Sequence, residues 1–283
     1  MRHEDHFVCP EDNMRKVILI AGGGELPNQV VENFTINKIL FYCISFKNNP
    51  LPNIRNKKNH KIINYGKIVT ELNRLKNIGF NEIIMIGNLN RPKISEIKPD
   101  INALKLISKF TRILLKGGDN NLFTLITETL EKLGFKVVDI RNVLPYNFLG
   151  KGNQTSVNLT EINKKDIQKG KMILNTISKF DIGQSIIIQQ GNVIGIETLH
   201  GTDNLIKVSN CYSNESDKPT LIKLVKKKQN LKVDLPTIGI KTLKNCKRFS
   251  IGGIAYSAKK TLFVNKEEII NFCNLNKIFL YGI

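Results

Sequence analysis

The chain has 283 residues with 43 Lys or Arg and 24 Asp or Glu, which gives a formal net charge of +19. At about 150 residues per domain this length suggests about two domains, and 41% hydrophobic with 24% charged residues excludes wholesale disorder. No stretch approaches the ~18 consecutive apolar residues of a membrane-spanning helix, and residues 1–13 lack the apolar core of a signal peptide. We therefore expect a cytoplasmic protein.

The five cysteines are an odd number, lie far apart and form no CxxC pair, which argues against a disulfide framework or a zinc ribbon and fits reduced thiols in a cytoplasm. A charge of +19 attracts anions such as nucleotides, anionic lipids or nucleic acid. However, the chain has no Trp and only 7% aromatic residues, so it lacks the stacking surfaces of single-strand binders. We expect no nucleic-acid partner.

Strands alternate with helices in the first half of the chain. Residues 1–13 share no pattern with the rest of the chain, so we interpret them as an extension before a fold that starts at Met14. The expected strands are 17–21, 39–46, 61–65, 82–86 and 135–139, and the expected helices are 67–77, 101–116 and 119–133. This alternation predicts βαβ units and a parallel sheet.

Residues 144–158, which contain Pro, Gly, Asn and Ser, have the strongest loop composition, and we place the domain boundary there. We expect an N-terminal domain at 14–147, a linker at 148–160 and a C-terminal domain at 161–283. In the second domain the expected helices are 164–178, 237–246 and 266–274, and the expected strands are 185–189, 193–198, 221–225, 262–264 and 278–281. This mixture predicts an α/β protein.

Three glycines follow the first expected strand, at Gly22, Gly23 and Gly24, and Pro27 suits the first turn of the helix that comes next. Such a turn lets the backbone approach a phosphate, and the helix N-terminus offers free N–H groups. A dinucleotide site is disfavoured because Pro27 replaces the third glycine and the second strand ends at Lys47 rather than at an acidic residue. We favour contact with a nucleotide or sugar phosphate over a turn without a ligand.

Two further glycine-containing segments carry polar candidates. Gly87 ends an expected strand, and Asn88 and Arg91 follow at the sheet edge where open α/β sheets bind ligands. Contact of these side chains with phosphate or uracil edges has about the same weight as a ligand-free loop. Gly118 and Asp119 precede and open an expected helix, where an Asp is most often a cap, so we favour capping over ligand contact.

Acidic residues stand at the ends of expected elements in the second half. Glu197 lies near the end of a strand, Asp203 follows it, and Asp234 lies in a short apolar stretch before a proline. Mg²⁺ prefers carboxylates, usually one or two, with substrate phosphates and water completing its coordination. We therefore expect Glu197, Asp203 and Asp234 to bind Mg²⁺, although singly Asp203 also suits a helix cap and Glu197 a strand-edge charge.

Six motifs stand in order: Gly-Gly-Gly-Glu-Leu-Pro at 22–27, Gly…Arg-Pro at 87–92, Gly-Asp at 118–119, Phe-Asp-Ile-Gly-Gln-Ser at 180–185, Glu…Gly-Thr-Asp at 197–203 and Val-Asp-Leu-Pro-Thr-Ile-Gly at 233–239. Together they resemble the UDP-2,3-diacylglucosamine pyrophosphatases of lipid A biosynthesis, of the type unrelated to calcineurin-like phosphoesterases. The resemblance covers Lys16 to Ile283, and its last two motifs are specific. Asn120 departs from the family's Gly-Asp-Asp, which puts any role of a second carboxylate there in doubt.

The resemblance implies a Rossmann-like N-terminal domain with a parallel sheet, a distinct C-terminal α/β domain and a ligand cleft between them. It implies Mg²⁺-dependent hydrolysis of UDP-2,3-diacylglucosamine to UMP and 2,3-diacylglucosamine 1-phosphate (lipid X), with Asp234 as the essential aspartate that binds the metal or orients the attacking water. Substrate contacts are expected from the motif residues and from a lysine that neutralises the diphosphate, namely Gly22, Gly23, Gly24, Leu26, Gly87, Asn88, Arg91, Gly118, Asp119, Gln184, Thr202, Lys223 and Thr237.

The acyl chains of such a substrate require an apolar cleft and access to a membrane. The basic face of residues 101–116 offers electrostatic attachment to anionic lipid, but we favour an ordinary surface helix. Peripheral contact with the inner membrane and assembly into a homo-oligomer are left open. The alternative function is a non-catalytic nucleotide-sugar or lipid-binding protein on the same scaffold, and a nicotinamide-dependent oxidoreductase is a less favoured third.

Overall fold

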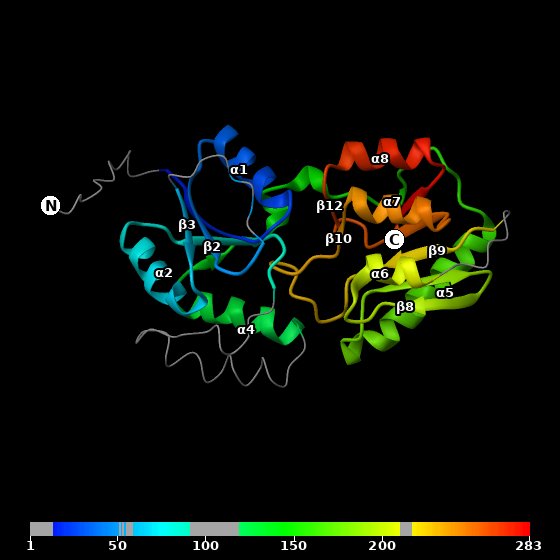
Figure 1. Cartoon of the computed structure of the whole chain (residues 1–283), viewed down its shortest axis with the longest axis horizontal. Coiled ribbons are helices and arrows are strands. Elements are labelled where there is room, and N and C mark those ends of the chain that lie inside the picture. The colour runs from blue at the N-terminus through cyan, green and yellow to red at the C-terminus, as the bar shows by residue number, and fades with distance from the viewer. Residues whose placement is uncertain (1–13, 51, 53, 55–58, 91–118, 210–216) are drawn as a thin grey trace. The chain divides into compact units, whose positions relative to one another are not determined.

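The computed structural model describes residues 14–50, 52, 54, 59–90, 119–209 and 217–283 (Figure 1). The chain divides into two compact units. The N-terminal unit comprises residues 1–116 and 125–143, and the C-terminal unit comprises residues 117–124 and 144–283. None of the described helices is long and apolar enough to cross a membrane.

The N-terminal unit contains a five-stranded sheet in which every neighbouring pair is parallel. The strands are β1 (Lys16–Ala21), β2 (Leu40–Phe46), β3 (His60–Ile63), β4 (Glu82–Ile86) and β5 (Lys136–Val137), in the order β3-β2-β1-β4-β5. The helical elements are α1 (Leu26–Ile36), η1 (Tyr65–Lys67), α2 (Ile68–Asn77), η3 (Ile140–Asn142) and α4 (Asp119–Lys132), whose residues 119–124 belong to the C-terminal unit. The parallel sheet confirms the prediction from alternating strands and helices.

Strand β1 shows why the sequence forms a sheet of this kind. Val17, Ile18 and Leu19 are fully buried although neighbouring side chains of a strand point to opposite faces. A strand buried on both faces needs an uninterrupted apolar run, which is typical of parallel sheets covered by helices. The same strand pairs with β2 on one side and β4 on the other, so it is central.

The C-terminal unit contains a mixed six-stranded sheet in the order β6-β13-β11-β9-β7-β8 and a separate parallel pair, β10-β12. The strands are β6 (Gly152–Asn153), β7 (Ser185–Gln189), β8 (Asn192–Ile196), β9 (Thr220–Lys223), β10 (Thr237–Ile238), β11 (Gly253–Tyr256), β12 (Leu262–Phe263) and β13 (Phe279–Gly282). The helices are η4 (Pro145–Asn147), α5 (Glu161–Ile177), η5 (Ser178–Phe180), α6 (Gly201–Val208), α7 (Ile240–Arg248) and α8 (Lys266–Leu275).

The six-stranded sheet separates two hydrophobic cores. On one face Ile186 and Ile188 of β7 pack with Ile167 of α5. On the other face Ile187 packs with residues of α6, α7 and α8, including Leu205. The alternation along β7 thus directs successive side chains to different cores, with α5 on one face and α7 and α8 on the other (Figure 1).

The structure differs from the predicted elements in a few places. The expected helix 237–246 is wrong at its start, because Thr237 and Ile238 form β10 and the extended Gly239 caps a helix that begins at Ile240. Helix α6 and strand β11 were not predicted. Strand β6 lies in the segment 148–160 that we expected to be a linker, and the domain limits themselves stay a prediction. The expected helix 101–116 lies outside the described residues.

Candidate functional site

Three adjacent strands of the C-terminal unit bring polar residues together in an otherwise apolar sheet. Ser185, the first residue of β7, is paired with Lys223, the last residue of β9. On the other side of β7, Glu197 follows β8 and its backbone N–H donates to the carbonyl of Ser185 at 2.8 Å. All three residues are buried, so the sheet register itself places an ammonium and a carboxylate in the interior near one another.

Lys223 is 6% exposed, and its ammonium donates to Thr202 Oγ1 at 2.9 Å and to the Thr237 carbonyl at 3.0 Å. Burial lowers the pKa of Lys223, while the negative charges of Glu197, Asp203 and Asp234 oppose that shift. The three acidic residues predicted from the sequence therefore act on one buried lysine.

The hydroxyl of Thr202 joins Lys223 to Glu197. Thr202 Oγ1 lies 2.7 Å from Glu197 Oε1, and it also lies 3.2 Å from the Ser185 hydroxyl. Because a hydroxyl has one proton, which Thr202 donates to the carboxylate, Ser185 is the donor in its contact with Thr202. The second carboxylate oxygen of Glu197 accepts from the backbone N–H of Gln184 at 3.1 Å.

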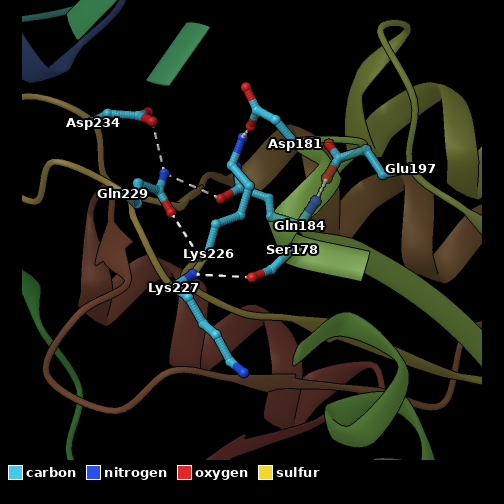
Figure 2. A network of polar contacts seen from close by, with 8 residues as sticks. All are labelled: Ser178, Asp181, Gln184, Glu197, Lys226, Lys227, Gln229 and Asp234. Carbon is cyan, nitrogen blue, oxygen red and sulfur yellow. Dashed lines mark hydrogen bonds and ion pairs between the residues drawn. The ribbon is translucent and has the colours of Figure 1, made fainter. Parts of the chain in front are cut away.

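Asp234 lies on the irregular segment between β9 and β10, beside Gln229 (Figure 2). The amide nitrogen Nε2 of Gln229 donates to Asp234 Oδ2 at 2.9 Å and faces Gln184 Oε1 at 3.4 Å. Gln184 thus takes part twice, because its backbone N–H donates to Glu197 and its side-chain oxygen faces Gln229. A chain of hydrogen-bonded residues therefore links Lys223 to Asp234 through Thr202, Glu197, Gln184 and Gln229.

Asp203 stands in the first turn of α6 and is held from α7. Thr242 donates its hydroxyl to Asp203 Oδ1 at 2.8 Å, and the Lys241 ammonium lies 3.6 Å from Oδ2. These contacts join two helices, and the structure does not show the helix-capping role that we considered for this residue. Among the residues that the structure describes, no group of three His, Cys, Asp or Glu side chains is arranged to hold a metal ion. Asp203, Glu197 and Asp234 are therefore gathered around Lys223 without forming a ready three-carboxylate metal site.

In the N-terminal unit, the two glycine turns lie against each other at the carboxyl ends of β1 and β4. The backbone N–H of Gly23 donates to the Asn88 carbonyl at 3.0 Å, and the N–H of Asn88 donates to the Gly23 carbonyl at 2.8 Å. A Cβ atom on Gly22 would lie 2.3 Å from the Asn88 carbonyl oxygen, so glycine is needed for this close approach. Gly87 has a φ of +94°, which also requires glycine.

From β1 the chain adds β2 and β3 on one side of the sheet, and it then adds β4 and β5 on the other side of β1. The two turns, which follow β1 and β4, therefore lie where the strand order reverses. Ligands of open α/β sheets bind at this point. Gly24 is exposed there with a φ of +104°. The Leu26 side chain is 9% exposed at the first position of α1, so it packs inside the unit.

The remaining predicted contacts divide into two groups. Arg91 and Gly118 lie outside the described residues, and Asp119 begins α4. Gln184, Thr202, Lys223 and Thr237 are brought together in the network of the C-terminal unit.

Comparison with known protein families agrees with this division into two units. Residues 16–146 match the LpxI N-terminal domain, and residues 150–281 match the LpxI C-terminal domain. The chain belongs to the LpxI family. The resemblance that the six motifs indicated is thereby confirmed, as are a parallel-sheet N-terminal domain and a separate α/β C-terminal domain of an LpxI protein.

A curated LpxI protein of Caulobacter vibrioides is 27% identical to the chain over 278 residues, which is 95% of this chain and 98% of that protein. Its name is UDP-2,3-diacylglucosamine pyrophosphatase LpxI. The alignment therefore covers both LpxI domains rather than one of them.

Sequence analysis missed two residues of the polar network. Gln229 and Ser185 are uncharged, and neither was among the candidate site residues. Ser185 stands at the end of a motif, and Gln229 follows three lysines in a segment without helical or strand periodicity. The one available signal was that Gln229 stands five residues before Asp234 in a short loop.

Proposed function

We propose that the chain hydrolyses the pyrophosphate bond of UDP-2,3-diacylglucosamine and releases UMP and 2,3-diacylglucosamine 1-phosphate. The observation that carries this proposal is the match of both LpxI domains over nearly the whole chain, together with the activity in the name of the Caulobacter vibrioides relative. The polar network supports it, because the Lys223 ammonium can stabilise negative charge that develops on phosphate oxygens as a P–O bond breaks, and Asp234 offers a carboxylate for a divalent cation.

Lys223 is proposed to contact a substrate phosphate. Its ammonium has three N–H donors, and Thr202 and the Thr237 carbonyl take two of them. The third N–H is proposed to donate to a phosphate oxygen. The negative charge of Glu197, which is held by Thr202 and Gln184, opposes the lowering of the Lys223 pKa by burial.

Asp234 is proposed as the catalytic carboxylate and as the protein ligand of Mg²⁺. A single carboxylate suits this ion, which commonly takes one or two from the protein and completes its coordination with substrate phosphates and water. Bound Mg²⁺ would neutralise charge on the phosphate oxygens. The oxygens of Glu197 and Asp203 are engaged by hydroxyl and backbone donors, so we assign these two residues to the electrostatic balance of Lys223 rather than to the metal.

The glycine turns at Gly22–Gly24 and at Gly87–Asn88 are proposed to contact a phosphate or the nucleotide through backbone groups. The exposed Gly24 and the N-terminus of α1 are suited to this, since free N–H groups at a helix start attract anions. Leu26 contributes by its backbone, because its side chain is buried.

Release of UMP from UDP-2,3-diacylglucosamine tests the proposal directly. The purified chain should release UMP in the presence of Mg²⁺, and excess EDTA should abolish the release, which added Mg²⁺ should restore. Tight binding of the substrate without release of UMP would instead favour the non-catalytic alternative. Release of UMP that is indifferent to EDTA would refute the metal assignment and leave the hydrolase intact.

A further inference from the structure

The side chain of Gln229 is 9% exposed and lies between Asp234 and Gln184, in the segment that joins β9 to β10 (Figure 2). We propose that Gln229 is a positioning residue that holds the Asp234 carboxylate in place for hydrolysis. This inference rests on the proposed function, in which Asp234 is the catalytic carboxylate.

The orientation of the Gln229 amide is fixed by the backbone. Its oxygen Oε1 accepts from the N–H of Lys226 at 3.0 Å, and a backbone N–H can only donate. The amide nitrogen must therefore face the opposite side, where it meets Asp234 Oδ2 at 2.9 Å and Gln184 Oε1 at 3.4 Å. Turning the amide by half a rotation would set donor against donor at Lys226 and acceptor against acceptor at Asp234.

The segment that carries Gln229 is itself anchored to regular elements. The Lys226 ammonium pairs with Asp181 at the end of η5, and the N–H of Lys227 donates to Ser178 Oγ at 3.3 Å. The Gln229 N–H donates to the Lys226 carbonyl at 3.1 Å, which closes a turn. Asp234 is held from its own side, since its backbone N–H donates to the Asn230 carbonyl at 2.8 Å. A rigid turn thus presents the amide nitrogen to the carboxylate.

A glutamate at position 229 would keep the contact with Lys226 and reverse the contact with Asp234. Its carboxylate could still accept from the Lys226 N–H, but it would set a negative oxygen against Asp234 Oδ2 and against Gln184 Oε1. The anchoring of the turn and the donation to Asp234 are therefore separable by substitution.

The test compares Gln229→Met and Gln229→Glu with wild type. Met has a similar length and lacks the amide, so the donor to Asp234 is lost with little change in volume. Loss of a hydrogen-bond partner of a metal-binding side chain, the role proposed for Asp234, typically costs about 10–100-fold in metal affinity or activity. We expect kcat for UMP release to fall by that factor in both variants, with KM changed less than about 3-fold, and a cooperative thermal transition in each variant checks that it is folded.

Gln190→Met is the matched control. Gln190 also donates its amide nitrogen to an aspartate, Asp217 Oδ2 at 3.0 Å, but it lies at the β7–β8 turn, at the opposite end of β7 from Gln184. Its kcat should equal that of wild type.

Near wild-type kcat in Gln229→Glu would overturn the proposal and leave Gln229 as an anchor of the turn alone. An equal loss of kcat in Gln190→Met, or a loss that appears only in KM, would also overturn it. Wild-type protein that releases no UMP would refute the proposed function instead, so the two failures are distinct.

Discussion

The ammonium of Lys223 and the carboxylate of Glu197 are joined through the hydroxyl of Thr202, which lies 2.9 Å from Nζ and 2.7 Å from Oε1. Both residues are less than one-tenth exposed. Buried charges of this kind are tolerated only when hydrogen bonds satisfy them, and removal of one partner leaves an uncompensated charge in the interior. One uncharged side chain thus connects the two buried charges of the site.

Thr202→Val should destabilise the protein although it changes the shape of the side chain very little. The valine removes an acceptor from Lys223 and a donor from Glu197, and leaving buried polar groups unsatisfied costs about 1–3 kcal/mol. We expect a loss of about 2–3 kcal/mol in the free energy of unfolding, measured by urea denaturation, and near-complete retention in Thr202→Ser. Thr176→Val, which removes an exposed hydroxyl bonded to the Met172 carbonyl, serves as control and should change little. Equal free energies of unfolding for Thr202→Val and wild type would show that the hydroxyl of Thr202 does not stabilise the protein.

Asp234→Asn should lose activity while the protein stays folded. The amide keeps the size of the side chain and an oxygen that can accept from Gln229, but it removes the negative charge. Loss of a catalytic acid or base typically costs about 10²–10⁴-fold, so we expect UMP release to fall by at least about 100-fold with an unchanged thermal midpoint. Asp217→Asn, which alters the partner of Gln190, is the control. Retention of a tenth or more of the wild-type rate would remove Asp234 from the catalytic role.

The sheet of the N-terminal unit was predictable because its strands β1, β2 and β4 are apolar runs that alternate with helices. The sequence also indicated the two glycine turns, but it suggested only phosphate contact as the reason for the glycines. Gly22 is adjacent to Asn88 in space and 66 positions away in the chain, so the close backbone contact between the turns leaves no local pattern. Glycine is favoured both at a phosphate site and where two loops approach closely, so its presence alone does not distinguish the two.

The site of the C-terminal unit was predicted in part for a similar reason. Acidic residues at element ends pointed to Glu197, Asp203 and Asp234, and Lys223 was expected to contact the substrate, but the sequence did not show that the three negative charges act on this one buried lysine. Gln229 was missed because an amide in an irregular loop carries no periodicity. Thr237 was assigned to a helix since a two-residue strand is too short to show alternation.

Gly22→Ala should destabilise the N-terminal unit. The added Cβ would lie 2.3 Å from the Asn88 carbonyl oxygen, a backbone atom that cannot move without opening the paired turns. Forcing extra volume into a packed site typically costs about 1–3 kcal/mol, so we expect the thermal midpoint to fall by several degrees. Gly150→Ala is the control, because nothing lies within 4 Å of its added Cβ. Equal midpoints for the two variants would show that the turns separate easily.

A pH-dependent contribution to stability should come from Glu71, a buried residue of α2 that accepts from Lys61 at 2.7 Å and from Arg74 at 2.6 Å. Burial alone would raise the pKa of Glu71, but the hydrogen bonds and charges of Arg74 and Lys61 outweigh it and lower the pKa below its ordinary value. A carboxyl whose pKa is lower in the folded state stabilises the fold above its unfolded pKa of about 4.3 and loses that contribution as the pH falls through the folded value.

Glu71→Gln should therefore lower the free energy of unfolding by about 1 kcal/mol at pH 7, a modest value because both cationic partners are about half exposed. The difference from wild type should persist down to about pH 5 and shrink below about pH 4. Urea denaturation at pH 7, 5, 4 and 3 measures it, with Glu161→Gln as control because Glu161 pairs with Lys164 on the exposed surface of α5. A difference that is constant over this range, or that grows toward acid, would mean that Glu71 does not stabilise the fold through its charge.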